Sequence, residues 1–207
     1  MRRPALAARC AAVAAGALLL TAVASAAAAD DVLDDRSVDI GVSIAEPTAP
    51  GVLAMTVAAA STALTEDGST ELVRRFTGAL PTVTVTDTRS PEEIPAGAGW
   101  YVLGSASAFT ASDGQEPIGA DHLGWTPRLL DGGDSGLVTE GDPVDTVLDE
   151  GEDAVGLVDQ ELLALALDSG AVAEEGAWTA SADLVLSTEP DVAAGDYSGS
   201  LTLSLFE

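Results

Sequence analysis

Apolar and polar residues alternate along several short stretches of this chain. In residues 38–44 every second side chain is Val or Ile, and the side chains between them are Asp, Gly and Ser. Successive side chains of a strand point to opposite faces, so this period of two predicts a strand with one apolar face. The same period predicts further strands at residues 53–57, 80–86, 100–103, 182–187 and 198–206.

Two stretches are harder to assign from their pattern. Residues 159–168 contain good helix formers, but Leu163, Leu165 and Leu167 alternate and glycines lie on both sides, so a strand is preferred over a helix. Residues 129–153 carry nine acidic residues, no basic residue and the turn-forming pairs Gly-Gly and Asp-Pro. We predict that they form a long exposed connection.

Many short strands separated by clusters of Gly, Pro, Asp and Ser indicate an all-β chain. Such strands bury their apolar faces when two sheets pack together. We therefore predict an antiparallel β-sandwich, immunoglobulin-like or jelly-roll-like, with long acidic loops. It is expected to form one domain over residues 30–207, because 178 residues fall within the usual range of about 100–200 for a domain.

The first 29 residues have the composition of a removable secretory signal. Three arginines precede an almost unbroken run of Ala, Val and Leu, and small-residue triplets at 24–26 and 27–29 are suitable cleavage sites. We expect residues 1–29 to be a signal peptide and the remainder to be secreted to the extracellular cell surface. A retained membrane anchor is the alternative, since a membrane helix needs about 20 apolar residues.

Charge and cysteine content narrow the possible partners of the exported part. Residues 30–207 keep five arginines against 34 acidic residues, which gives a net charge of −29. A field of that sign repels nucleic acid and anionic lipid, so we expect no nucleic-acid partner and no stable membrane insertion after leader removal. The only cysteine lies in the leader, which excludes disulfides and zinc–thiolate sites from the rest.

Recognisable catalytic motifs are scarce in the sequence. His122 is the only histidine and would have to be the base of any Ser–His–Asp triad, and no Gly-x-Ser-x-Gly or His-Glu-x-x-His motif occurs. The acidic clusters at 131–134 and 149–153 lack the ligand spacing of an EF-hand loop. We expect no enzyme activity, no cofactor and no metal site, with structural calcium as the open alternative.

Aromatic and charged residues supply the candidate ligand contacts. Trp100 and Trp125, with Tyr101, are side chains that could stack on a sugar ring. The three tryptophans of the chain also suit a sandwich core, and we expect at least two of them to be buried. Asp87 and Arg89 are two residues apart on one predicted strand, so they share a face and could form an ion pair or contact a partner.

Five short segments follow one another in the second half of the chain. They are Thr-Val-Thr-Asp-Thr-Arg at 84–89, Gly-Trp-Tyr-Val at 99–102, Ala-Phe-Thr at 108–110, Ile-Gly-Ala at 118–120 and Gly-Asp-Tyr-Ser-Gly-Ser-Leu-Thr-Leu-Ser-Leu at 195–205. Their order resembles the WxL domain of Gram-positive surface proteins over about residues 80–207. Val102 replaces the leucine of the first Trp-x-Leu motif, and the second motif, at 203–205, lacks its tryptophan.

The resemblance implies a β-sandwich, a cell-surface setting and non-covalent attachment to peptidoglycan. We therefore expect a secreted, non-catalytic surface module that associates with cell-wall glycan or other surface proteins, or acts in adhesion. The alternative is a structural subunit of a surface fibre, in which the unpaired edge of residues 201–206 would pair with a strand of another chain. An extracellular hydrolase is the third possibility.

Overall fold

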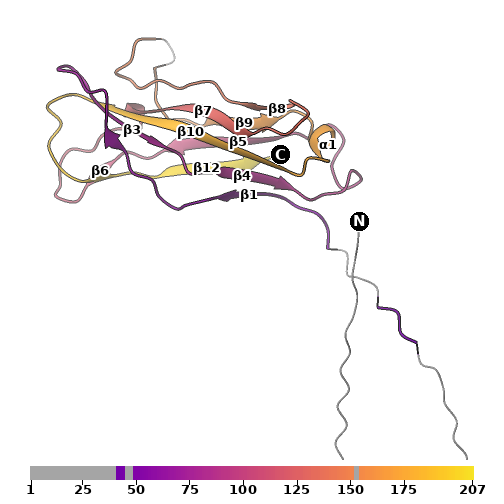
Figure 1. The fold of residues 1–207 in the computed structure, drawn as a ribbon. Coiled ribbons are helices and arrows are strands. Elements are labelled where there is room, and N and C mark those ends of the chain that lie inside the picture. The colour runs from indigo at the N-terminus through magenta and orange to yellow at the C-terminus, as the bar shows by residue number, and fades with distance from the viewer. Residues whose placement is uncertain (1–40, 45–48, 152–153) are drawn as a thin grey trace, which may run out of the picture. The chain divides into compact units, whose positions relative to one another are not determined.

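Strands make up nearly all of the regular structure in this protein (Figure 1). The structure, a computed structural model, describes residues 41–44, 49–151 and 154–207. Residues 41–44 have no regular secondary structure and are exposed. The predicted signal peptide and residues 30–40 lie outside the described residues. The described residues from 49 onward belong to one compact unit.

All strand pairs of the first sheet are antiparallel. One edge of this sheet is formed by two short strands that follow each other in the sequence, β1 (Leu53–Val57) and β2 (Thr65–Glu66). They pair with β4 (Val83–Asp87) and β3 (Arg74–Ala79), respectively. The long strand β10 (Ala177–Thr188) pairs with β3 and β4 on one side and with β7 (Leu123–Asp131) on the other.

The second sheet also has four antiparallel strands. Their order is β12 (Leu201–Phe206), β5 (Trp100–Ala106), β9 (Glu161–Ala166) and β8 (Val138–Glu140). Near the Ala106 end of β5, the short strands β6 (Thr110–Ala111) and β11 (Tyr197–Ser198) pair with each other. Two short helices complete the fold: η1 (Ala120–His122) and α1 (Ser169–Val172).

The core lies between the two sheets and follows from the alternation along the strands. In β4, Val83 and Val85 are buried while Thr84 and Thr86 are partly exposed. The Trp100 ring of β5 packs on the Trp178 ring of β10, with centroids 5.2 Å apart. Burying one Val or Leu side chain stabilises the fold by about 1.5–3 kcal/mol, and the sum of these contributions holds the two sheets together.

One side of the sandwich is closed by backbone hydrogen bonds. The Trp125 N–H and C=O of β7 bond to Val144 at 2.9 Å, and Gly141 donates to Leu163 of β9 at 3.1 Å. Leu157 joins the sheets directly, because its N–H donates to Leu123 of β7 and its C=O accepts from Ala106 of β5. The segment that follows β8 therefore seals this side.

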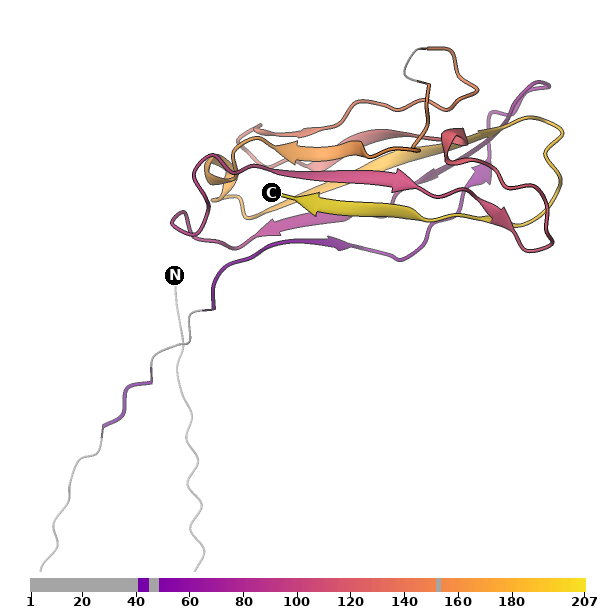
Figure 2. The ribbon, with the colours of Figure 1, turned by 180° about the vertical axis from the view of Figure 1, so that it is seen from behind.

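The opposite side lies between β1 and β12, the edge strands of the two sheets. Neither strand is followed by a further strand in its sheet within the described part of the chain. Figures 1 and 2 show both strands along the same side of the sandwich. This side remains open.

The all-β antiparallel sandwich predicted from the sequence is confirmed. Residues 161–166 form a strand rather than a helix, as preferred, although Leu167 is exposed beyond its end. The prediction of a continuous exposed connection over residues 129–153 is wrong, because β7 extends to Asp131 and β8 lies within it. The strand predicted at 38–44 is absent from residues 41–44, and its remainder lies outside the described residues.

Candidate functional site

The two tryptophans predicted as ligand contacts are core residues. Trp100 is 1% exposed and Trp125 is 2% exposed, and Trp178 is equally buried. The expectation that at least two tryptophans are buried is therefore confirmed for all three. The prediction that Trp100 or Trp125 stacks on a sugar is wrong, because both rings are buried and neither has a face open to solvent.

Local geometry explains why Trp125 fits inside the sandwich. Gly104 of β5 leaves the space that the indole occupies, since a Cβ at this position would lie 2.5 Å from Trp125 Cη2. A larger residue at 104 would force the ring to move. The third tryptophan has a polar partner, because the Trp178 indole N–H donates to Glu175 Oε2 at 2.7 Å and lowers the pKa of that carboxyl.

Asp87 and Arg89 bind each other, which confirms the predicted ion pair. Arg89 Nη2 donates to Asp87 Oδ2 at 2.6 Å and Arg89 Nε to Asp87 Oδ1 at 2.8 Å, and both side chains are nearly buried. These hydrogen bonds hold the pKa of Asp87 below its ordinary value, against the opposing effect of burial. Arg89 also contacts Glu207, so its donors are used within the domain.

Tyr101 is the one predicted ligand contact with a partly exposed ring. Its residue is 39% exposed, and the ring stacks on Phe206 of the neighbouring strand β12 with centroids 5.2 Å apart and planes 13° apart. Tyr101 alternates with the buried Trp100 and Val102, so the pair lies on the outer face of the second sheet.

The described residues contain no cluster of metal-ligating side chains, and the single histidine is held by a backbone carbonyl. His122 Nδ1 is 2.7 Å from the Ser187 carbonyl oxygen, which only accepts, so this nitrogen is its donor. No group of three or more His, Cys, Asp or Glu that could hold a metal ion occurs among the residues described. In the acidic cluster at 149–153, Asp149 is bound by Arg75 and Thr146, while residues 152–153 lie outside the described part.

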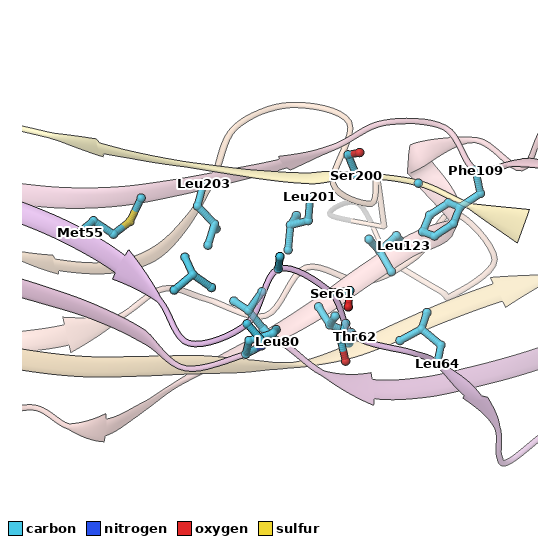
Figure 3. Close-up of a pocket in the computed structure, with 16 residues that line it drawn as sticks. Met55, Ser61, Thr62, Leu64, Leu80, Phe109, Leu123, Ser200, Leu201 and Leu203 are labelled. Carbon is cyan, nitrogen blue, oxygen red and sulfur yellow. The ribbon is translucent and has the colours of Figure 1, made fainter.

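The open side of the sandwich forms a groove of about 470 Å³ (Figure 3). We call it the seam groove. Its walls and floor come from Met55 and Val57 of β1, Leu201 and Leu203 of β12, and Leu80, Leu123 and Leu184 between them. Leu201 and Leu203 point from β12 toward Leu80, as Figure 3 shows.

A second hollow of about 670 Å³ continues the seam groove past Phe109. The two hollows share Ser61, Thr62, Leu64, Phe109 and Gly199, so they form one elongated depression. No Asp, Glu, Arg or His lines the first hollow, although the chain has 34 acidic residues. The seam groove is thus an uncharged apolar surface on a strongly acidic protein.

Along β12, alternate backbone groups beside this groove have no partner strand within the described part of the chain. Ser107 N–H donates to the Ser200 carbonyl at 2.8 Å, and the register pairs Thr202 with Ser105 of β5. Hydrogen-bonded and non-bonded pairs alternate along antiparallel strands, so Leu201, Leu203 and Leu205 direct their N–H and C=O groups away from β5. The side chains of the same three leucines pack against the core cluster.

No protein-family model matches this chain, and no curated protein is significantly similar to it in sequence. The resemblance to the WxL domain therefore stays a prediction. Within the described part of the chain, no helix has the length and apolar character needed to cross a membrane.

Sequence reasoning identified β12 as a candidate edge but missed the groove beside it. A signal was present, because the two walls come from residues 49–65 and 197–206 and neither stretch contains a charged residue. That signal does not reveal by itself that the two stretches face each other, which requires the order of strands in both sheets.

Proposed function

We propose that this protein is a secreted, non-catalytic module of the cell surface that binds an extended protein segment along the seam groove. The observation that carries the proposal is the free edge of β12 beside an uncharged apolar groove. An added strand would bond to the backbone of β12 and place alternate side chains in the groove. Adhesion to surface proteins and assembly of surface structures both use binding of this kind.

The sequence of β12 supports a binding role for its edge. Soluble proteins usually protect edge strands with charged residues, proline, bulges or covering loops, because a free edge invites pairing with other chains. Residues 201–206 contain neither a charge nor a proline, and they pair evenly with β5 over their whole length. An edge without these protections is suited to a partner.

Cell-wall glycan is the second candidate partner, and one observation favours it. Tyr101 and Phe206 stack on the outer face of the second sheet, and a partly exposed tyrosine can cover a sugar ring while its hydroxyl makes a polar contact. Because both candidate tryptophans are buried, Tyr101 is the remaining aromatic residue of the predicted site. The glycan hypothesis therefore depends on Tyr101 rather than on Trp100 or Trp125.

The experiment measures retention of the exported chain on cell envelopes, with and without prior protease treatment of the envelopes. Leu203→Pro removes an N–H that faces away from β5, and Leu203→Ala is the matched control that shortens the same side chain but keeps the N–H. We expect retention to need envelope protein and to fall about fivefold or more in Leu203→Pro, since one hydrogen bond of about 1 kcal/mol is lost and the proline ring obstructs the incoming strand.

Leu203→Ala keeps the backbone contacts of the edge but shortens one wall of the groove, so its retention should lie between those of the wild type and Leu203→Pro. Retention that survives protease treatment and disappears in Tyr101→Ala would overturn the protein-binding proposal in favour of glycan. Equal retention by all variants would exclude both sites.

A further inference from the structure

We propose that the seam groove accepts residues 38–44 of a second copy of this chain, so that copies assemble head to tail by strand donation. This inference rests on the proposed function and names its partner. We call residues 38–44 the donor segment. Its residues 38, 40, 42 and 44 are Val or Ile, and the residues between them are Asp, Gly and Ser. One face of this segment is apolar, and the other is small or polar.

The donor pattern matches the strand that it would join. In β12, leucines at 201, 203 and 205 alternate with Thr202 and Ser204, and the leucines face the core. A donated strand beside β12 would continue the second sheet, with its Val and Ile side chains on the groove side and its polar side chains outward. The uncharged lining of the groove suits these aliphatic side chains.

The described end of the donor segment carries two exposed apolar side chains. Val42 is 84% exposed and Ile44 is 86% exposed, and residues 41–44 have no regular secondary structure. Alternating apolar side chains suit a strand with one buried face. Segment and groove are therefore complementary in chemistry.

The chain is fixed to the first sheet just before β1. Val52 is bonded to Thr88, and the Gly51 N–H donates to the Glu93 carboxylate. The donor residues precede this attachment in the sequence. A segment that returned to the groove of its own copy would leave the wild type monomeric, so the test below separates that outcome from donation to a second copy.

Donor and acceptor are different surfaces, so each copy can accept one strand and donate another. Such heterologous contacts build open chains unless the geometry closes a ring. The expected product is a linear assembly.

The test uses two variants that remove different halves of the contact. Ile40→Asp with Val42→Asp places charges on the apolar face of the donor, and Gly41→Asp with Ser43→Asp is its control, with the same added charge on the opposite face. Leu203→Pro blocks the acceptor edge, with Leu203→Ala as control. The molar mass of each exported protein is measured by light scattering as concentration increases.

We expect the wild type and the Gly41→Asp/Ser43→Asp control to assemble, and Leu203→Ala to assemble more weakly than the wild type because it shortens a wall of the groove. Each disabled variant alone should stay monomeric, with association at least about fivefold weaker. An equimolar mixture of the two disabled variants should form a dimer and stop there, because one supplies only an acceptor and the other only a donor. A monomeric wild type, loss of assembly in the Gly41→Asp/Ser43→Asp control, or failure of the mixture to dimerise would overturn the inference.

A second measurement covers the case in which Leu203→Pro does not fold. The exported chain has no cysteine, so Ser43→Cys and Thr202→Cys each introduce a single thiol on the outward faces of donor and acceptor. A mixture of the two should cross-link through a short bismaleimide about tenfold faster than either variant alone. Equal rates would contradict strand donation.

This inference and the proposed function fail in different ways. A monomeric chain whose envelope retention is lost in Leu203→Pro and kept in Leu203→Ala would use the groove for another protein, and only the inference would fall. A chain that neither assembles nor depends on Leu203 for retention would remove both.

Discussion

At the scale of single residues, the most constrained polar group is Arg89. It bonds to Asp87 at the end of β4 in the first sheet and to Glu207, which follows β12 in the second sheet. The guanidinium therefore links the ends of two strands that belong to different sheets. Asp87 is almost fully buried, and Arg89 is 10% exposed and keeps Glu207 as a second charged partner.

We predict that Asp87→Asn lowers the free energy of unfolding by about 2 kcal/mol at pH 7, because charge-assisted hydrogen bonds to Arg89 are lost while Arg89 keeps Glu207. The folded-state pKa of Asp87 lies below its ordinary value, so its contribution is complete above the unfolded-state pKa of about 3.9. It disappears as the pH falls through the lower folded-state value. Urea unfolding of both proteins from pH 7 to pH 2 should show their difference shrinking only in that acidic range.

The exposed pair of Arg74 and Glu66 provides the control for this prediction. Arg74 Nη2 lies 3.0 Å from Glu66 Oε2, and both side chains are well exposed. Glu66→Gln should change the free energy of unfolding by less than about 1 kcal/mol. Equal effects of the two substitutions would contradict the structural importance assigned to the buried pair.

At the scale of elements, adjacent residues on one strand have opposite roles. Trp100 and Tyr101 lie side by side in β5, but the first faces the core and the second faces outward. Trp100→Ala should lower the free energy of unfolding by about 3–5 kcal/mol, as for other large core aromatics. Tyr101→Ala removes only a surface stack and should cost about 1 kcal/mol, measured by the same urea titration. Similar losses for both would mean that the face assignment of β5 is wrong.

The edge position of β12 predicts which of its backbone amides exchange quickly with deuterium. Thr202 and Ser204 donate toward β5 and should exchange slowly with deuterium, whereas Leu201, Leu203 and Leu205 face away and should exchange quickly in a monomeric variant such as Ile40→Asp/Val42→Asp. In assembled wild type the three leucine amides should become protected. Fast exchange of these amides in a demonstrated assembly would show that its contact lies elsewhere.

The sequence predicts about half of the strands but not their partners. Alternation of apolar and other residues identified β1, β4, β5, β10 and β12, and favoured β9. It missed β3, β7 and β8, because Gly124 and Pro127 interrupt the pattern of β7 and acidic turn-forming residues surround β8. The closed side depends on Leu157, whose backbone bridges β5 and β7, and no local pattern reports such a contact. The open groove is the consequence of these distant pairings.

At the scale of the whole molecule, negative charge is almost unopposed. Each arginine within the described residues, Arg74, Arg75, Arg89 and Arg128, is already paired with a carboxylate. The remaining carboxylates repel one another across the surface and between copies. Salt shortens the range of this repulsion, from about 10 Å at 0.1 M to about 3 Å at 1 M.

We therefore predict that an increase in sodium chloride from about 0.05 M to about 0.5 M raises both the melting temperature and the degree of assembly, because it shortens the range of the repulsion. Calcium chloride at the same ionic strength distinguishes general screening from specific sites, because an ion that binds the folded state stabilises it further as its concentration rises above the Kd. Equal effects of the two salts would support a solvated acidic surface. A larger stabilisation by calcium, reversed by a chelator, would instead support the structural-calcium alternative. A melting temperature that falls with added sodium chloride would contradict the view that self-repulsion limits stability, since weakened attraction would then outweigh weakened repulsion.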